Sequence, residues 1–337
     1  MFRVIKLKYI LIIFLIFTIL FSIFFLSAQF VKADEAEKDD YIKWVDFSVP
    51  YTVLDKTYNL NVKSHNENYP VKYNWIELIS YLSAKYFGNL NQFKQSDLDN
   101  LISSLNNGKT MDDLTQDMQY YDYYLESYTA VLGGFVGEYE IQVDNTKTFE
   151  KRYGLKAFSP IARGYSFTHY DDFGNSRSYG YNRKHLGNDL MGNIGTPIIA
   201  VESGYVEALG WNQYGGWRIG IRSFDKKRYY YYAHLRKDHP YNSELVEGSI
   251  VTAGEVIGYL GMTGYSAREN VNNINVPHLH FGLQLIFDES QKDGVNQIWV
   301  DVYTLVEFLR KNTSKVYYDS DSKEYFRQYD MFEDFNK

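Results

Sequence analysis

The sequence predicts an α+β protein in which a mostly antiparallel β-sheet domain follows a small helical module and an apolar N-terminal helix. Three observations support this prediction. Residues 9–26 are almost entirely apolar, residues 71–135 show helical spacing of apolar side chains, and from about residue 155 short β-rich runs alternate with glycines. The expected division of the 337 residues is 1–33 as the apolar N-terminal segment, 34–70 as a linker or extended segment, 71–150 as the helical module, 151–312 as the β domain and 313–337 as a polar tail.

The N-terminal segment is typical of an exported protein. Three cations precede the apolar run at 9–26 and two acids follow it at 34–35. This charge order predicts that the N-terminus stays in the cytoplasm and the rest of the chain lies outside. The run is long enough to span a bilayer, whereas Val31-Lys32-Ala33 is similar to a signal-peptide cleavage site. We therefore expect an extracellular or cell-wall protein, either anchored to the membrane by residues 1–33 or secreted after loss of a signal peptide.

The helical module is predicted from capping residues. Three apolar patterns each begin with a residue that can cap a helix and that is followed three positions later by Glu or Asp, at Asn74, Ser96 and Thr110. The third pattern runs toward Gly133. No catalytic constellation is evident here, so we expect a structural or spacer role, with binding of a protein partner as the alternative.

The chain outside this module shows two other sequence patterns. Residues 41–70 look extended or irregular, whereas glycine-punctuated β runs fill 155–285 and predict a β-sheet or barrel-like sandwich. Apolar spacing after Asp301 predicts a terminal helix. The polar residues 313–337 are expected to be loosely held.

Composition excludes several classes of protein. The net charge of −7 leaves no basic excess to neutralise phosphates, so we expect no nucleic-acid partner. Because the chain has no cysteine, it has neither disulfides nor thiolate zinc sites. Any metal must be held by histidine and carboxylate.

Five groups carry the pattern of a metal-dependent hydrolytic site. His185 and Asp189 are four residues apart, so a strand or a helix would bring both side chains to one face. His278 and His280 are two apart, which in a strand places both rings on one face about 6.6 Å apart along the backbone. His234 ends a run of tyrosines. A hydrolytic zinc ion needs three protein ligands and an open position, which leaves two imidazoles for proton handling and charge stabilisation.

The remaining histidines have no such partner pattern. We expect structural roles for His65, His169 and His239.

The order of these motifs resembles the M23 zinc metallopeptidases of the lysostaphin or LytM type. The resemblance covers roughly residues 180–285 and is carried by four segments in order: His185-Leu-Gly-Asn-Asp189 with 195–206, Tyr232-Ala-His234-Leu235, the glycine-rich run 251–266, and Pro277-His-Leu-His280-Phe281. It implies a LytM or lipoyl-like β-sandwich with a groove. Residues 267–276 depart from the family pattern, and we expect them to form a loop near the groove that affects substrate choice.

The resemblance also implies residue roles. It implies one Zn²⁺ per catalytic domain, bound by His185, Asp189 and His280, with His278 as general base and His234 stabilising the oxyanion. The implied activity is hydrolysis of peptide bonds in peptidoglycan stem peptides or cross-bridges, so a peptidoglycan peptide is the expected substrate. Spacing alone does not divide these roles among the imidazoles.

Two alternatives differ from an independent enzyme. One is a non-catalytic LytM-like binding or activating module, as in relatives that lack metal ligands, although all five groups are present here. The other is a membrane-tethered component of a wall-spanning assembly, in which the helical module binds partners. A lipoyl carrier domain is rejected, since no lysine lies in a suitable hairpin and the histidines would have no role.

Overall fold

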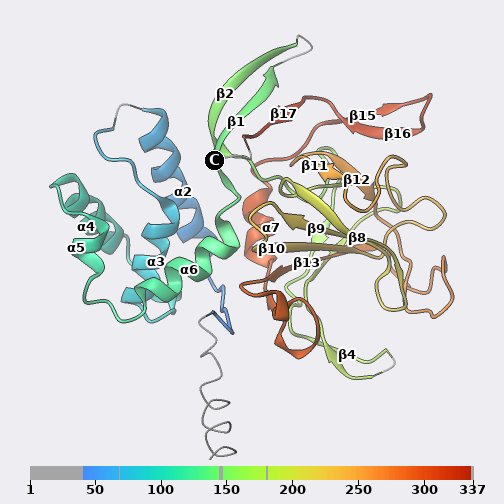
Figure 1. The fold of residues 1–337 in the computed structure, drawn as a ribbon, viewed down its shortest axis with the longest axis horizontal. Helices are drawn as coiled ribbons and strands as arrows, with labels where there is room; N and C mark the ends of the chain where they lie inside the picture. Colours follow the sequence, from blue (N-terminus) through green and yellow to red (C-terminus); the bar gives the residue numbers. More distant parts are fainter. Residues whose placement is uncertain (1–40, 68, 144–146, 180, 335–337) are drawn as a thin grey trace, which may run out of the picture. The chain divides into compact units, whose positions relative to one another are not determined.

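The helices in the first part of the chain begin closer to its N-terminus than the sequence predicts. A computed structural model describes residues 41–67, 69–143, 147–179 and 181–334, so the predicted membrane or signal segment lies outside the described residues. Within the described part of the chain, no helix is both long and apolar enough to cross a membrane. The helices are α2 (Tyr51–Asn66), α3 (Trp75–Lys85), α4 (Gln95–Asn106), α5 (Met111–Thr115) and α6 (Tyr121–Leu132), shown together in Figure 1.

The prediction of an extended segment over 34–70 is wrong for residues 51–66, which form α2. The buried side of α2 includes polar residues, among them Thr57, Asn61 and Ser64. Thr57 satisfies its hydroxyl by donating to the carbonyl of Val53 at 2.8 Å, one turn earlier. Because the buried stripe is partly polar, the helix lacks the apolar period that reveals an amphipathic helix.

Two of the three predicted helix starts are confirmed. The Asn74 side chain accepts a hydrogen bond from the backbone N–H of Ile76, and Thr110 forms a capping box with Asp113. Ser96 does not cap, because α4 already begins at Gln95. The third predicted helix is divided into the separate helices α5 and α6.

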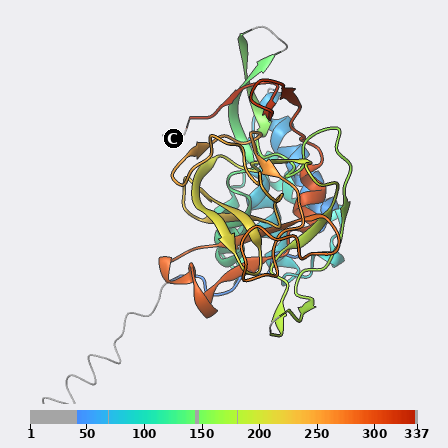
Figure 2. The ribbon, with the colours of Figure 1, turned by 90° about the vertical axis from the view of Figure 1, so that its right-hand side faces the viewer.

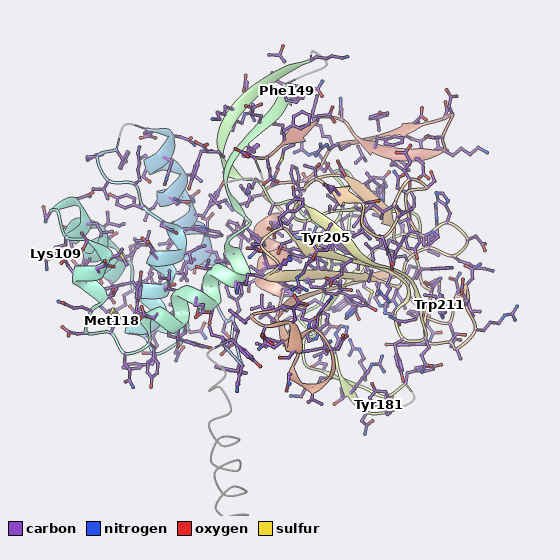
Figure 3. The ribbon with its side chains drawn as sticks, in the orientation of Figure 1. Lys109, Met118, Phe149, Tyr181, Tyr205 and Trp211 are labelled. Atoms are coloured by element: carbon purple, nitrogen blue, oxygen red, sulfur yellow. The ribbon has the colours of Figure 1, made fainter. Side chains whose placement is uncertain are left out.

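The helical module ends earlier than the predicted residue 150. A hairpin follows α6, formed by β1 (Val136–Val143) and β2 (Thr148–Leu155). Figure 2 shows this hairpin projecting from the molecule, and Figure 3 labels Phe149 on it.

The expectation of a loosely held tail over 313–337 is also wrong for most of its length. This segment forms β15 (Val316–Asp319), β16 (Glu324–Arg327) and β17 (Met331–Phe332), and β17 pairs with β1. Glu324 is buried and accepts a hydrogen bond from the hydroxyl of Tyr259. Specific polar contacts of this kind hold the tail together with a few separated apolar side chains such as the buried Met331, which form no periodic pattern, so hydropathy does not reveal it.

The central sheet confirms the predicted mostly antiparallel architecture. Its strands follow the order β11-β8-β9-β10-β13-β6-β3, with β14 paired to β13, and all of these pairs are antiparallel. The bounds are β3 (Thr168–His169), β6 (Asn188–Met191), β8 (Gly204–Asn212), β9 (Gly216–Ser223), β10 (Arg228–Ala233), β11 (Ile250–Val251), β13 (His278–Leu285) and β14 (Ile298–Val300). The shorter strands are β4 (Ser176–Arg177) with β5 (Arg183–Lys184), and β7 (Pro197–Ile199) with β12 (Val256–Tyr259).

The helices and the sheet share one core, so residues 42–337 form one compact unit. The predicted terminal helix is confirmed as α7 (Tyr303–Leu309). Its buried Phe308 contacts Tyr58 of α2 and stacks on Trp75 of α3, with ring centroids 5.3 and 5.7 Å apart.

A buried arginine makes a second connection between the helices and the sheet. Arg228 of β10 forms an ion pair with Glu202 at 2.7 Å and donates to the backbone carbonyl of Ala130 in α6 at 2.9 Å. The helical segment is therefore attached to the β-sheet by both apolar and ionic contacts.

Candidate active site

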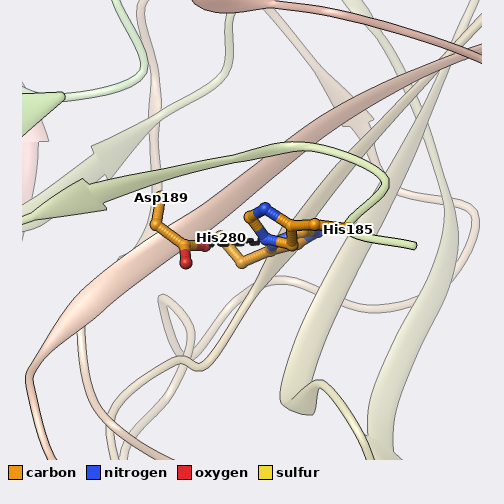
Figure 4. A group of neighbouring side chains, drawn as sticks. All are labelled: His185, Asp189 and His280. Atoms are coloured by element: carbon orange, nitrogen blue, oxygen red, sulfur yellow. Dashed lines mark hydrogen bonds and ion pairs between the residues drawn. The ribbon is translucent and has the colours of Figure 1, made fainter. Parts of the chain in front are cut away.

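The strand register brings together the residues predicted as metal ligands. Asp189 on β6 is directly opposite His280 on β13, and His185 lies in the turn that leads into β6. Figure 4 shows the three side chains converging. His185 Nε2 lies 2.8 Å from His280 Nδ1 and 3.1 Å from Asp189 Oδ1, and His280 Nδ1 lies 3.3 Å from the same carboxylate oxygen.

These three side chains fit a zinc ion. Two ligands that each lie about 2.0–2.2 Å from a tetrahedral zinc ion are about 3.3–3.6 Å apart. The observed separations of 2.8–3.3 Å are close to this spacing. Two imidazole nitrogens and one carboxylate oxygen are also the donor set of a catalytic zinc site, which leaves a fourth position open.

The sequence did not reveal Asp172, which orients His185. The carboxylate and the backbone carbonyl of Asp172 lie 3.2 and 3.1 Å from His185 Nδ1. Since both groups accept, a proton lies on Nδ1 toward Asp172, and Nε2 faces Asp189 and His280. Asp172 lies in a loop thirteen residues before His185, at a spacing that matches no motif.

Arg177 of β4 is a second contributor that sequence reasoning missed. Its guanidinium donates to Asp172 Oδ2 at 2.6 Å and to Asp189 Oδ2 at 3.3 Å. It therefore holds the oxygen of Asp189 that is turned away from the two histidines, and it connects Asp172 to the same network.

The electrostatics of this group favour an ionised carboxylate. Burial opposes the charge on Asp189, but hydrogen bonds from His185 and His280 hold its pKa well below the usual range. Burial lowers the pKa of His280 and so favours its neutral, metal-binding form. Burial also opposes a charge on His185, yet the carboxylates of Asp172 and Asp189 raise its pKa to about 9.

His234 and His278 lie beside the three converging side chains. The ring centroid of His234 is 4.8 Å from that of His278 and 5.8 Å from that of His280. His278 Nε2 lies 3.6 Å from Asp189 Oδ1. The structure thus places all five predicted site residues in one cluster.

Backbone carbonyls fix the tautomers of these two imidazoles. His234 Nδ1 lies 2.9 Å from the carbonyl oxygen of Thr263, and His278 Nδ1 lies 2.8 Å from that of Val276. A carbonyl can only accept, so both Nδ1 atoms carry protons and each neutral ring presents a lone pair at Nε2. Burial, together with neighbouring His278 and His280, lowers the pKa of His234 well below its usual value. A neutral His234 therefore has no Nε2–H to donate to an oxyanion.

The cluster opens into a cavity of about 540 Å³. The cavity extends from His185, Asp189, His234 and His280 over the sheet, and it is also lined by Arg183, Lys184, Leu186, Glu207, Ala208, Asn212, Tyr214, Gly215, Arg218, Tyr229, Tyr231, Tyr265, Gln284, Lys292, Asp293, Gln297 and Trp299. Residues 267–276 do not line it, although Tyr265, two residues before them, does. The predicted influence of this loop on substrate choice therefore remains a prediction.

Three tyrosine side chains, those of Tyr179, Tyr214 and Tyr265, lie together near His234. The ring of Tyr265 lies 5.7 Å from His234 and stacks on Tyr179 at 4.8 Å. Arg183 donates to the Tyr265 hydroxyl at 3.1 Å and lies 5.0 Å from the ring of Tyr214. These residues come from three separate segments, so their meeting here could not be read from local sequence.

Comparison with known proteins identifies the domain that carries the site. Residues 183–295 match the model of peptidase family M23, and all five site residues lie within that range. This segment of the chain is therefore a peptidase family M23 domain.

Two characterised relatives support this assignment over part of the chain. The chain is 38% identical over 124 residues to L-Ala–D-Glu endopeptidase from Bacillus subtilis, which covers 37% of this chain and 36% of the relative. It is 42% identical over 98 residues to lysostaphin from Staphylococcus simulans, which covers 29% of this chain and 17% of the relative. The chain thus spans only about a third of the first relative and about a sixth of the second.

A solved structure extends the likeness in fold beyond the M23 domain. A crystal structure of a candidate glycyl-glycine endopeptidase lytM from Ruminococcus gnavus aligns with a TM-score of 0.52 at 21% sequence identity. The alignment covers 82% of this chain and 93% of that one. This match confirms a LytM-like fold.

Proposed function

We propose that the protein is a zinc-dependent endopeptidase that hydrolyses peptide bonds in peptidoglycan stem peptides or cross-bridges. The observation that carries this proposal is the convergence of His185, Asp189 and His280 beside two imidazoles with free Nε2 lone pairs. The relatives named as endopeptidases support the reaction class. The cavity next to the cluster supplies space for a peptide.

His185, Asp189 and His280 would hold the zinc ion. When bound there, zinc supplies a Lewis acid that lowers the pKa of water and polarises the scissile carbonyl. Asp172 and Arg177 position two of these ligands through His185 Nδ1 and Asp189 Oδ2. The ligand atoms therefore need little rearrangement to bind the metal.

His278 acts as the general base in this proposal. Its proton lies on Nδ1, held by the carbonyl of Val276, so Nε2 can take a proton from the attacking water. Its proximity to Asp189 stabilises the imidazolium that forms. The protonated ring can then deliver this proton to the leaving amine.

His234 starts the reaction as a neutral proton acceptor. To donate a hydrogen bond to the oxyanion it must first take up a proton at Nε2, because Nδ1 is engaged with Thr263. We therefore assign His234 a role in stabilising the tetrahedral state only in its protonated form, with the proton taken up from solvent, because the proton of the attacking water passes to His278 and then to the leaving amine.

We further propose that the enzyme acts outside the cytoplasm, with residues 1–33 as signal peptide or anchor. The M23 domain, within residues 151–312, performs the chemistry, and residues 71–135 support it or bind a partner. The charge order around residues 9–26 supports the orientation.

The test is zinc content and peptide release for the purified chain, a His280→Ala variant and a matched His65→Gln variant. His65 stacks on Tyr153, outside the cavity. We expect about one zinc per chain and cleaved stem or bridge peptides from the parent and from His65→Gln. We expect neither from His280→Ala. If the parent binds zinc but releases no peptide from peptidoglycan, the result would favour a non-catalytic binding or activating module instead.

A further inference from the structure

Arg218 on β9 is a cation in the cavity without an acidic partner. It is half-buried and lines the cavity, and within the described part of the chain its guanidinium forms neither an ion pair nor a hydrogen bond. Arg222, four residues further along the same strand, is paired with Glu207 and Glu289 at 3.3 and 2.9 Å. Of these two strand neighbours, Arg218 alone is free to bind an anion.

The strand register places Arg218 level with the zinc site. His280 is opposite Asp189 on one side and opposite Ala233 on the other. The β9–β10 pairing runs from Arg222 opposite Tyr229 to Ile219 opposite Tyr232, so one further step puts Arg218 beside Ala233. Because neighbouring strands are about 4.8 Å apart, the Cα atom of Arg218 lies about 10 Å from that of His280.

Small neighbours leave the space above Arg218 open. Gly210 is opposite Arg218 on β8, and Ala233 is its expected neighbour on β10. Neither residue carries a side chain long enough to cover the guanidinium. The arginine can therefore be reached from the cavity.

The other charges of the cavity leave this region positive. Lys292 forms an ion pair with Glu207, which also pairs with Arg222. Lys184 and Asp293 are exposed, so solvent screens both. Arg183 is held by the carbonyl of Tyr179 and the hydroxyl of Tyr265 rather than by a carboxylate.

Tyr231 offers a hydroxyl donor on the same face. Its oxygen accepts a hydrogen bond from Asn212 Nδ2 at 3.1 Å, which leaves its own O–H able to donate. An arginine with an adjacent O–H donor is a suitable pair for a carboxylate.

We propose that Arg218 and Tyr231 form a subsite for a carboxylate of the peptide substrate. This inference rests on the proposed endopeptidase function and specifies its substrate class. An extended peptide advances about 3.3–3.6 Å per residue, so about 10 Å corresponds to a carboxylate within about three residues of the scissile bond. Acidic stem peptides meet this requirement, through the α-carboxylate of γ-linked D-glutamate or the C-terminal carboxylate. Neutral glycine bridges do not.

The test compares three versions of one stem peptide, L-Ala–γ-D-Glu–L-Lys–D-Ala. One carries both carboxylates free, one is amidated at the D-glutamyl α-carboxylate, and one is amidated at the C-terminus. Hydrolysis is measured with the zinc-loaded full chain, and binding with the zinc-loaded His278→Ala variant, which does not depend on turnover. We expect one of the two amidations to weaken binding roughly tenfold or more, and the position of that amide identifies the carboxylate.

Arg218 variants assign this preference to the subsite. In Arg218→Gln the ratio of the binding affinities for the acid and amide peptides should fall close to one. Arg218→Lys should retain part of the preference for the acid. A thermal melt confirms that each variant is folded. Arg152→Gln removes the same charge from an exposed position on β2, outside the cavity, and should retain the full ratio. The inference is overturned if the parent binds all three peptides equally, or if Arg218→Gln keeps the preference.

The two proposals fail in different ways. If the parent cuts a neutral glycine peptide but does not prefer the acidic peptide, the proposed endopeptidase function stands and the proposed carboxylate subsite is refuted. A parent that cuts no peptide refutes the function, while the binding ratios of the acid and amide peptides still decide the subsite.

Discussion

Asp172 Oδ2 lies 3.2 Å from His185 Nδ1, on the side of the imidazole opposite the atom that faces Asp189 and His280. This contact fixes which nitrogen of His185 is available to a metal. It also joins the loop before β4 to the proposed zinc site, since Arg177 binds both Asp172 and Asp189.

We expect Asp172→Asn to weaken zinc binding about 10–100-fold, because the variant loses the charge that orients His185. Competition with a chromogenic chelator measures this change. Asp171→Asn is the matched control, since Asp171 is exposed and adjacent but does not contact His185. Equal zinc affinity in the two variants would show that Asp172 does not position the ligand.

The buried arginine of β10 supports a prediction about stability. Replacing Arg228 with Met leaves Glu202 buried without its partner and removes the contact with Ala130. We expect a loss of about 3–5 kcal/mol in the free energy of unfolding, measured with urea. Arg152→Gln, which removes an exposed pair with Glu150, should change it by less than about 1 kcal/mol. Similar losses in both variants would contradict this account.

The shared core predicts that the β part does not fold alone. A fragment covering residues 155–337 lacks α2 and α3 and therefore exposes the buried ring of Phe308. We expect this fragment to show weak near-ultraviolet circular dichroism and no cooperative melt, whereas residues 41–337 should show both. A cooperative melt of the fragment would establish two independent domains.

His169 predicts a pH dependence of stability. Burial lowers its pKa in the folded state, while Glu307, 3.1 Å from Nδ1, partly opposes this effect. The unfolded chain thus binds a proton more readily, so His169 destabilises the fold as pH falls below the usual histidine pKa of about 6.5. Relative to a His169→Phe variant, which can keep the stacking on Tyr303, the parent should lose stability between about pH 7 and 5. Urea unfolding at both pH values measures the difference, and a constant difference would rule out this effect.

The spacing of His278 and His280 has direct structural meaning, whereas the prediction of the full set of five site residues rests on the family resemblance. His278 and His280 share a face of β13 since side chains alternate along a strand. Asn74 and Thr110 mark true helix starts because their side chains satisfy free N–H groups there.

Other features depend on contacts between distant segments and could not be predicted. Asp172 reaches the site from a loop and Arg177 from the short strand β4, and the course of both segments is set by the folded sheet. The position of Arg218 near the proposed zinc site follows only from the strand register that relates it to Ala233 and His280. Hydropathy does not predict the helix α2, because polar residues such as Thr57 on its buried side interrupt the apolar pattern.

The most direct test of the central claim is mass spectrometry of the products that the zinc-loaded chain releases from purified peptidoglycan, compared with those of His278→Ala. This substitution removes the proposed general base and retains the three proposed zinc ligands. The account predicts peptides with newly formed amino termini from the parent, and none above background from a variant that still binds zinc. Release of the same peptides at the same rate by His278→Ala, or none by a zinc-loaded parent, would contradict it.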